Sequence, residues 1–502
     1  MTADVDQELA RWWSELTQVA LFGTDRREPP PTPAPLPSRS GAEPEIAVLD
    51  AAALGSALLR AGAEPPPQTE SQIAPADDDQ RLAAQPRARQ LLELIMTQSP
   101  AGARLQTRLL WHWLQSAADA GRRIPHRWLL DVLDRLHREP AITGDPDRLN
   151  LIRTVADERG RWLSELDPAW RWLQQDLSPP TDPGQWARRP TATRAAALRR
   201  LRPEDPAAAR LLISSALPTD GAQDRATLLG CLQTNLGPAD ESLLEQGLDD
   251  RSGIVRATAA ELLDGLDGSA RAVRMADRLR TLLSVHGLIN KKLSIELPHA
   301  PDADGLRDGL GKPPTRRSER GYWLERIAAG APLSVWTDAT GREPAPTWAM
   351  INDEDARSGI ITAILARHDQ QWAGALSADR EGMRARPEAF LQLMHLLPAD
   401  AWEQRAIDWL SDLNTPTLIG RVIRGVPTPW GSRLSLTAVN ALDRVNLPIG
   451  DLIEPLARAL HPSALDRLSE LATGQGSVAT REGARNLTQY LTLKIEIAEA
   501  FR

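Results

Sequence analysis

One octapeptide frame recurs at a fixed interval in the middle of the chain, and each copy opens with an arginine. The three copies are RAAALRRL at 194–201, RATLLGCL at 225–232 and RATAAELL at 256–263. A repeat period of about 20–50 residues is typical of proteins built from stacked structural units, each of which contacts only its neighbours. We therefore predict an array of repeat units around these three segments.

The third unit, residues 239–266, has the pattern of two short amphipathic helices. In its second half the apolar residues fall at helical spacing: Val255, Ala259, Leu262, Leu263 and Leu266. Such a stripe follows the 3.6-residue period of a helix. The polar run between the halves predicts a turn, with Ser252 as the N-cap of the second helix. A single helix pair cannot bury this stripe alone, so we expect neighbouring pairs to cover it.

This unit resembles a HEAT repeat, with paired helices, aspartate in the turn, and V-R followed by A-x-x-L-L in the second helix. We expect each opening arginine to bond a turn aspartate of its own or an adjacent unit, which would set the stacking register. The alternative is a solvated surface arginine, because exposed ion pairs contribute little. The residues of this predicted repeat signature are Arg194, Arg225, Asp249, Asp250 and Arg256.

The composition restricts the class of protein. The net charge is −8, which does not favour nucleic acid as a partner. A single cysteine, Cys231, excludes intrachain disulfides and cysteine metal clusters. The first residues have no signal-peptide pattern, and no apolar run reaches the length of a membrane-spanning helix. We therefore expect a cytoplasmic protein with no membrane association.

The distribution of proline, glycine and helical periodicity predicts an all-α chain, a HEAT-like α-solenoid of stacked helical hairpins with proline-rich linkers near its N-terminus. A helix over 6–22 should end at Gly23, the acidic segment 64–80 should be mobile, and 292–298 is the best strand candidate. The predicted parts are an N-terminal helix (1–27), proline-rich linkers flanking a short helix (28–84), a helical block (85–178), HEAT-like repeats (186–290), a strand and loop excursion (291–320) and a second helical block (321–502).

No pattern in the sequence supports a catalytic, cofactor-binding or metal site. GLRDGLGKP at 305–313 departs from a phosphate loop in its spacing and in having Pro313 after the lysine. The histidines show no metal-ligand spacing, and Cys231 lies inside a repeat helix, where a buried thiol is the simpler interpretation. We expect no cofactor, and whether the chain is an enzyme stays open, with a non-enzymatic role favoured.

Two groups of charged and aromatic residues are candidates for binding a partner. They are Asp25, Arg26 and Arg27 after the first helix, and Arg159, Arg161, Trp162, Trp170 and Trp172 in the N-terminal helical block. The first group could instead neutralise the helix dipole. The second could instead be core aromatic residues covered by arginine stems.

Several separated stretches resemble a bacterial family of unknown function. They are ALFGTDRR at 20–27, RRIPHRWLLDVLD at 122–134, ERGRWLSELDPAWRWL at 158–173, residues 224–266 and YWLERIAAGAPLSVW at 322–336. The resemblance implies genes encoded beside a MoxR-type AAA+ ATPase, a von Willebrand factor A protein and a SWIM zinc-finger protein. It supplies no catalytic residues.

We therefore expect a non-enzymatic adaptor or scaffold for an AAA+ ATPase and von Willebrand factor A chaperone or remodelling system. Solenoids present long surfaces that suit extended partners. The alternative is a nucleic-acid-binding or repair solenoid that uses arginine and tryptophan on its concave face. A helical enzyme whose carboxylates meet only in three dimensions is the third hypothesis.

Overall fold

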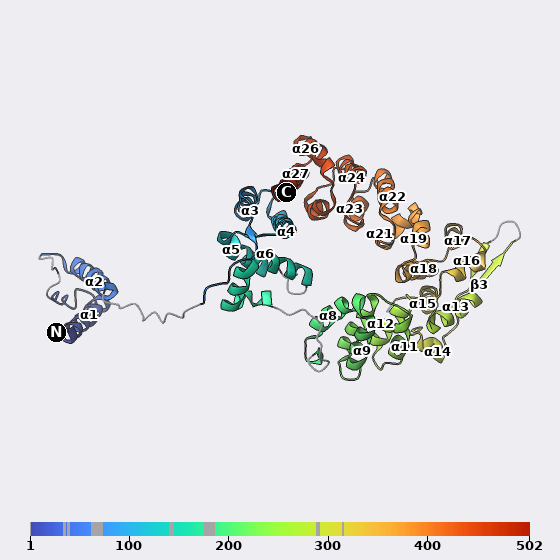
Figure 1. The fold of residues 1–502 in the computed structure, drawn as a ribbon, viewed down its shortest axis with the longest axis horizontal. Helices are drawn as coiled ribbons and strands as arrows, with labels where there is room; N and C mark the ends of the chain where they lie inside the picture. The colour runs from blue at the N-terminus through green and yellow to red at the C-terminus, as the bar shows by residue number, and fades with distance from the viewer. Residues whose placement is uncertain are drawn as a thin grey trace. The chain divides into compact units, whose positions relative to one another are not determined.

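Helices account for nearly all of the regular structure that the computed structural model describes, which confirms the predicted all-α class. The described residues are 2–33, 37, 41–61, 74–139, 145–174, 186–287, 292–313 and 316–502. Two compact units divide the chain, Met1–Ala76 and Asp77–Arg502 (Figure 1). Much of the predicted proline-rich linker between them lies outside the described residues.

Unit 1, Met1–Ala76, contains the helices α1 (Thr2–Phe22) and α2 (Pro44–Ala61). The predicted end of the first helix at Gly23 is confirmed. Gly23 has a φ of 87° and its N–H donates to the carbonyl of Val19 at 2.9 Å. A left-handed residue after a helix is normally glycine, because a Cβ is strained there.

The core of unit 1 is small, and it depends on close approach of the two helices. Its buried apolar residues are Trp12, Leu16, Val19, Val48 and Ala51. A Cβ atom added at Gly55 would lie 2.2 Å from the ring of Trp13, so glycine lets α2 lie directly against this ring. Leu21 and Phe22 at the end of α1 remain exposed.

Unit 2, Asp77–Arg502, begins with a helical group within the predicted block 85–178, of which residues 140–144 and 175–178 lie outside the described residues. The last described segment of this group is a 3-10 helix. The elements are β1 (Leu82–Ala83), α3 (Pro86–Gln98), α4 (Ala103–Asp119), β2 (Arg122–Arg123), α5 (His126–His137), α6 (Pro146–Leu166) and η1 (Pro168–Gln174). Strands β1 and β2 pair in parallel.

Helix α6 is interrupted at Asp157, whose φ of 53° and ψ of −154° are not helical. The interruption is held by strand segments that the sequence analysis did not anticipate. The backbone N–H of Arg81 donates to Asp157 Oδ2 at 2.6 Å, and the N–H of Ile124 donates to the carbonyl of Val155 at 2.8 Å. The bond from Ile124 satisfies the carbonyl of Val155, which the interrupted helix leaves unpaired, and the bond from Arg81 holds the side chain of Asp157.

The predicted repeat region is a succession of short helices. They are α8 (Thr191–Glu204), α9 (Pro206–Ala216), α10 (Ala222–Gly230), η2 (Cys231–Gln233), η3 (Pro238–Asp240), α11 (Glu241–Leu248), α12 (Gly253–Leu263) and α13 (Ala270–Leu282). Arg194, Arg225 and Arg256 fall in α8, α10 and α12. The predicted stripe of α12 is buried at Val255 and Leu263.

One local prediction in the repeats needs correction. Ser252 is the N-cap of α12, but its hydroxyl makes no cap bond. Its backbone N–H instead donates to Asp250 Oδ1 at 2.7 Å, which stabilises the turn. In α9, Leu211 is 73% exposed, while Ile213 of the same helix is fully buried and supplies the core contact.

A short antiparallel hairpin follows the repeats. Strand β4 (Lys292–Ile295) confirms the first part of the predicted strand over 292–298, and it pairs with β3 (Leu283–His286), which the sequence analysis did not predict. The half-buried residues Leu293 and Ile295 pack against the main core. Helix α14 (Ala303–Arg307) lies in the predicted loop excursion.

The C-terminal block is helical to its end, as predicted. Its elements are α15 (Glu319–Gly330), α16 (Ser334–Thr340), α17 (Pro344–Met350), α18 (Glu354–Arg367), α19 (Gln370–Ser377), α20 (Arg380–Ala385), α21 (Pro387–Met394), α22 (Ala399–Asp412), α23 (Pro416–Gly425), α24 (Ser432–Arg444), η4 (Gly450–Leu452), α25 (Ile453–Ala459), η5 (Pro462–Ala464), α26 (Leu465–Thr473) and α27 (Val478–Ala500).

Several helices in this block pack against the next helix but one, while the most extensive packing is between α15 and α18 and between α26 and α27. Helix α17 contacts α19, α19 contacts α21, α21 contacts α23, α22 contacts α24 and α24 contacts α26. In the repeat region α10 likewise contacts both α8 and α12. Stacked helical hairpins produce this pattern of neighbours. The assignment to a HEAT-like solenoid stays a prediction.

The C-terminal helix α27 packs against α3 and α4, far away in the sequence (Figure 1). Phe501 meets the ring of Trp113 edge-on, with ring centroids 5.2 Å apart, and His112 Nε2 lies 3.2 Å from the carbonyl oxygen of Lys494. Buried residues of α3–α6 and of the C-terminal block form one continuous core, while α8–α12 have a separate core. The first helices of unit 2 therefore pack with its last helix and not with the repeats that follow them in the sequence.

Candidate functional site

Arg194 and Arg225 pair with the aspartate of the following turn, and Arg256 bonds the aspartate of the turn before it. The side chain of Arg194 lies 2.8 Å from Asp220 Oδ2. Arg225 donates to both carboxylate oxygens of Asp250, at 3.0 and 2.7 Å, and also to the carbonyl of Asp220 at 2.8 Å. Arg256 donates to the carbonyl of Asp250 at 2.7 Å. We call these five residues the arginine ladder.

Each turn aspartate of the ladder is shared by two units. Its carboxylate pairs with the arginine of the preceding unit, as an ion pair in Asp220 and through two hydrogen bonds in Asp250, and its backbone carbonyl accepts from the arginine of its own unit. The side chains of Arg194 and Arg225 are only 5% and 4% exposed, so neither is a solvated surface group. Burial opposes ionisation of Asp250, but the bonds from Arg225 and from the backbone N–H of Ser252, with the charges of Arg225 and Arg251, together outweigh it and hold its pKa below the usual value.

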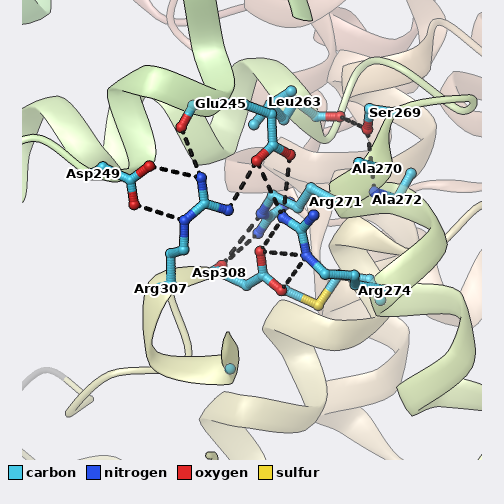
Figure 2. Close-up of polar contacts among 12 residues, drawn as sticks. Glu245, Asp249, Leu263, Ser269, Ala270, Arg271, Ala272, Arg274, Arg307 and Asp308 are labelled. Carbon is cyan, nitrogen blue, oxygen red and sulfur yellow. Dashed lines mark hydrogen bonds and ion pairs between the residues drawn. The ribbon is translucent and has the colours of Figure 1, made fainter. Parts of the chain in front are cut away.

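Asp249, the neighbouring residue of the predicted signature, takes no part in the ladder. Its carboxylate accepts two bonds from Arg307 of α14, at 2.6 and 2.8 Å (Figure 2). Arg307 also donates to Glu245 of α11, at 2.9 Å to Oε2 and 3.0 Å to its carbonyl. The bond from Arg307 lowers the pKa of Asp249. These contacts fasten the loop excursion to the repeats.

A buried carboxylate, Asp308, is the centre of the densest polar network shown in Figure 2. Arg274 donates to it from Nε and Nη2, at 2.9 and 2.5 Å, and Arg278 donates at 2.6 Å. Arg271 donates to the carbonyl of Asp308 at 3.2 and 3.0 Å. The Asp308 cluster comprises Asp308, Arg271, Arg274, Arg278, Arg307, Glu245 and Asp249.

The pKa of Asp308 indicates a structural role for this cluster. Asp308 has no exposed surface, and burial alone would raise its pKa. The bonds from Arg274 and Arg278 outweigh burial and lower it, so the carboxylate remains charged. A general acid needs the opposite shift, towards neutral pH. The cluster therefore fits a role in holding α11, α13 and α14 together.

The sequence analysis missed this cluster, although its signal was present. Arg271, Arg274 and Arg278 are spaced three and four residues apart, which places them on one face of a helix. Three guanidinium groups on one face of a helix must either be exposed to solvent or be paired with buried carboxylates. Their partner Asp308 lies in the segment 305–313, the weak match to a phosphate loop, and its carboxylate is paired with Arg274 and Arg278.

The tryptophan and arginine candidates of the N-terminal helical block interact within their own chain. The guanidinium of Arg159 lies 5.5 Å from the centroid of the Trp162 ring, and Arg161 pairs with Glu158 and Asp77. Trp170 Nε1 donates to Asp134 at 3.0 Å. Trp170 and Trp172 are half-buried and pack against the main core.

The candidates Asp25, Arg26 and Arg27 lie together after α1 and are exposed. Arg27 bonds the side chain of Gln18, while the neighbouring Thr24 donates to Glu45 Oε1 of α2 at 2.6 Å. The latter bond ties the loop to the start of the second helix. Among the described residues, the side chains of Asp25 and Arg26 have no ion pair or hydrogen bond.

The prediction that 64–80 is mobile is wrong for its last residues. Asp79 accepts from the backbone N–H of Arg159 at 3.1 Å, and its other oxygen lies 2.5 Å from His126 Nε2 and 3.0 Å from Arg123 Nε. Burial opposes ionisation of Asp79, but these bonds outweigh it and lower its pKa. Asp79 is fixed because its charge is paired, which composition alone does not reveal. Residues 64–73 of the predicted mobile segment lie outside the described residues.

A family model described as a family of unknown function, DUF5691, matches residues 15–501. The chain belongs to this family. The match contains every stretch on which the predicted resemblance depends, and it extends from α1 of unit 1 to the end of unit 2 of this DUF5691 protein. Among curated proteins and among solved structures, no match was found.

Among the described residues, no three or more histidine, cysteine, aspartate or glutamate side chains are grouped so that they could hold a metal ion. None of the helices in the described part of the chain has the length and apolarity needed to cross a membrane.

Proposed function

We propose that this DUF5691 protein is a non-enzymatic helical-repeat adaptor of the bacterial cytoplasm, built as a HEAT-like α-solenoid. Its proposed partners are a MoxR-type AAA+ ATPase and a von Willebrand factor A protein, which act as a chaperone or remodelling system. The arginine ladder carries the proposal, because in the ladder charged side chains join one unit to the next.

The internal pairing of charges supports a scaffold rather than a reaction centre. In the ladder and the Asp308 cluster, each carboxylate bonds at least one arginine of another helix or turn. These pairs fix the spacing and register of neighbouring helices. A stack with a fixed register presents its outward side chains at constant positions, which a large partner can recognise.

The partner classes follow from the resemblance of this chain to a family whose genes lie beside those of such ATPases and von Willebrand factor A proteins. An exposed apolar end of unit 1 adds support for protein binding. Leu21 and Phe22 are 76% and 60% exposed, and Leu49 of α2 is 69% exposed. Exposed apolar groups on a small helical unit favour contact with another protein.

The alternative of a nucleic-acid-binding solenoid has less support. Its best candidates, Arg159, Arg161 and Trp170, bond or stack within the chain. The third hypothesis needs carboxylates that converge on one reaction site. Glu245 and Asp308 are brought together through Arg274, but arginines pair both of them, and the pKa of Asp308 is held below its usual value.

The test is affinity capture of the tagged full-length chain from its native cells, followed by quantitative mass spectrometry. The proposal predicts enrichment of both the ATPase and the von Willebrand factor A protein over an untagged control, unchanged by nuclease treatment. Enrichment of neither protein would contradict the proposal. Recovery that depends on nucleic acid would instead favour the alternative.

A further inference from the structure

A basic pocket lies between the start of α3 and the segment from β2 into α5. Its volume is about 420 Å³, and its charged lining residues are Arg89, Glu93, Arg123, His126 and Arg127. The RRIPHRW stretch at 122–128, part of the family resemblance, supplies half of the lining residues and has no role in the proposed function.

The fold brings these side chains together through two helix starts. Proline precedes His126 at the beginning of α5, so His126 and Arg127 stand in its first turn. Arg89 and Glu93 lie one turn apart on the exposed side of α3, in the same helix as the buried Leu91 and Leu92. The pairing of β1 with β2 holds both segments side by side.

Asp79 fixes the inner wall of the pocket. Its carboxylate binds both Arg123, whose side chain is 16% exposed, and the ring of His126. The His126 ring is therefore oriented by Nε2, and its Nδ1 has no partner among the described residues. A histidine held in this way has one ring nitrogen left for a ligand.

The outer wall carries charge that the chain does not neutralise. The side chain of Arg89 makes no hydrogen bond or ion pair with the described residues. Arg127 lies over the Trp128 ring at 5.0 Å and reaches Glu93 at 3.6 Å, where both partners are largely exposed. Three guanidinium groups thus face two carboxylates, Glu93 and Asp79, in a chain whose net charge is −8.

We infer that this pocket binds the carboxylate side chains of an acidic segment in a protein partner. The local surplus of positive charge opposes the overall charge of the chain, and arginine pairs with carboxylates through two parallel bonds. Asp79 reduces the surplus, which suits single carboxylates better than phosphate dianions.

This inference depends on the proposed adaptor function, because it assigns one of the surfaces by which such an adaptor holds a partner. Its test uses the full-length chain labelled with ¹³C at histidine Cε1, since the His126 signal reports on the pocket even for weak ligands. The probes are the peptide acetyl-EELEE-amide, its neutral counterpart acetyl-QQLQQ-amide, and inorganic phosphate.

The expected result is a saturable shift of the His126 signal with the acidic peptide and none with the neutral one. Arg89→Gln should weaken binding about tenfold, the equivalent of one lost charge-assisted hydrogen bond. Arg251→Gln is the matched control, because Arg251 is also exposed but lies in the turn before α12, and it should leave binding unchanged.

Three outcomes would overturn the inference. They are no shift of His126 with the acidic peptide, a response to phosphate without one to the peptide, and equal effects of Arg89→Gln and Arg251→Gln. The adaptor proposal fails separately, if the native chain captures neither proposed partner. If Arg89→Gln captures both partners as the native chain does and the peptide does not bind, the pocket assignment alone is wrong.

Discussion

Arg225 illustrates how a single side chain can hold two repeat units together. Its guanidinium bonds the carboxylate of one turn and the carbonyl of another, and it is almost completely buried. Removing it leaves the Asp250 carboxylate without its charged partner in a mostly buried position. A buried ion pair is costly to break on one side, even where the intact pair contributes little net stability.

Arg225→Ala should lower the free energy of unfolding of the repeat region by about 2–4 kcal/mol. Hydrogen exchange followed by mass spectrometry, with α10 and α12 as reporters, measures this change. Arg256→Ala is the control, because Arg256 is exposed and donates to a carbonyl alone, so its loss should cost about 0.5–1 kcal/mol. Equal effects of the two substitutions would contradict the role of the ladder.

Asp308 should make the repeat region sensitive to acid. Its pKa is lowered in the folded chain, so the unfolded chain binds more protons between the folded value and about 3.9. The stability that its ion pairs provide is therefore present above about pH 4 and is lost as pH falls through the folded pKa.

Asp308→Asn removes this titration, so the variant should be less stable than the native chain at neutral pH and should lose less stability on acidification. Urea unfolding at a series of pH values, monitored through hydrogen exchange in α13, compares the free energy of unfolding of the native chain with that of the variant. A native chain and a variant with parallel pH profiles would show that Asp308 does not control acid stability.

At the scale of elements, the sequence pattern predicted where helices and one strand form, but not where a helix is interrupted or a loop is held in place by distant residues. The periodicity of Val255 and Leu263 predicted α12, and the alternation in 292–298 predicted β4. The interruption at Asp157 and the fixing of Asp79 depend on partners distant in sequence, Arg81 and His126. Pairing between residues distant in sequence leaves no periodic pattern. The cluster around Asp308 was not predicted for the same reason, because its ion pairs join α13 to a residue that follows α14.

Gly55→Ala tests the close packing of the first two helices. The added Cβ would overlap the Trp13 ring, so α2 must move away and the small core of unit 1 must open. Overpacking typically costs about 1–3 kcal/mol, which is large for a core of this size. Amide protection in α1 and α2 should fall while that of unit 2 is unchanged.

Gly230→Ala is the matched control for this substitution. Gly230 is helical, and nothing lies within 4 Å of a Cβ added there, so alanine should be neutral or stabilising by about 0.5–1 kcal/mol. Unchanged protection of α1 and α2 in Gly55→Ala would show that the helices do not depend on this contact.

At the scale of unit 2, the first helices and the last helix share one core. Phe501 near the C-terminus packs on Trp113 of α4, while the repeats that follow α6 in sequence keep a core of their own. The sequence analysis predicted both helical blocks but not their contact, because a helical stripe does not reveal which helix covers it.

Phe501→Ala should therefore reduce amide protection in α4 and α27 and leave α8–α12 unaffected. The loss of a half-buried aromatic contact should cost about 1–2 kcal/mol. Hydrogen exchange resolves the three regions in one experiment. Equal loss in α4 and in α8–α12 would contradict the separation of the two cores.

Binding between purified components tests the central claim, that this helical chain acts as an adaptor, most directly. The full-length chain is immobilised, and the MoxR-type ATPase and the von Willebrand factor A protein encoded in the same genome are passed over it, separately and together. The account predicts saturable binding of at least one of them, and binding of both when they are supplied together. The absence of saturable binding by either protein would contradict the account.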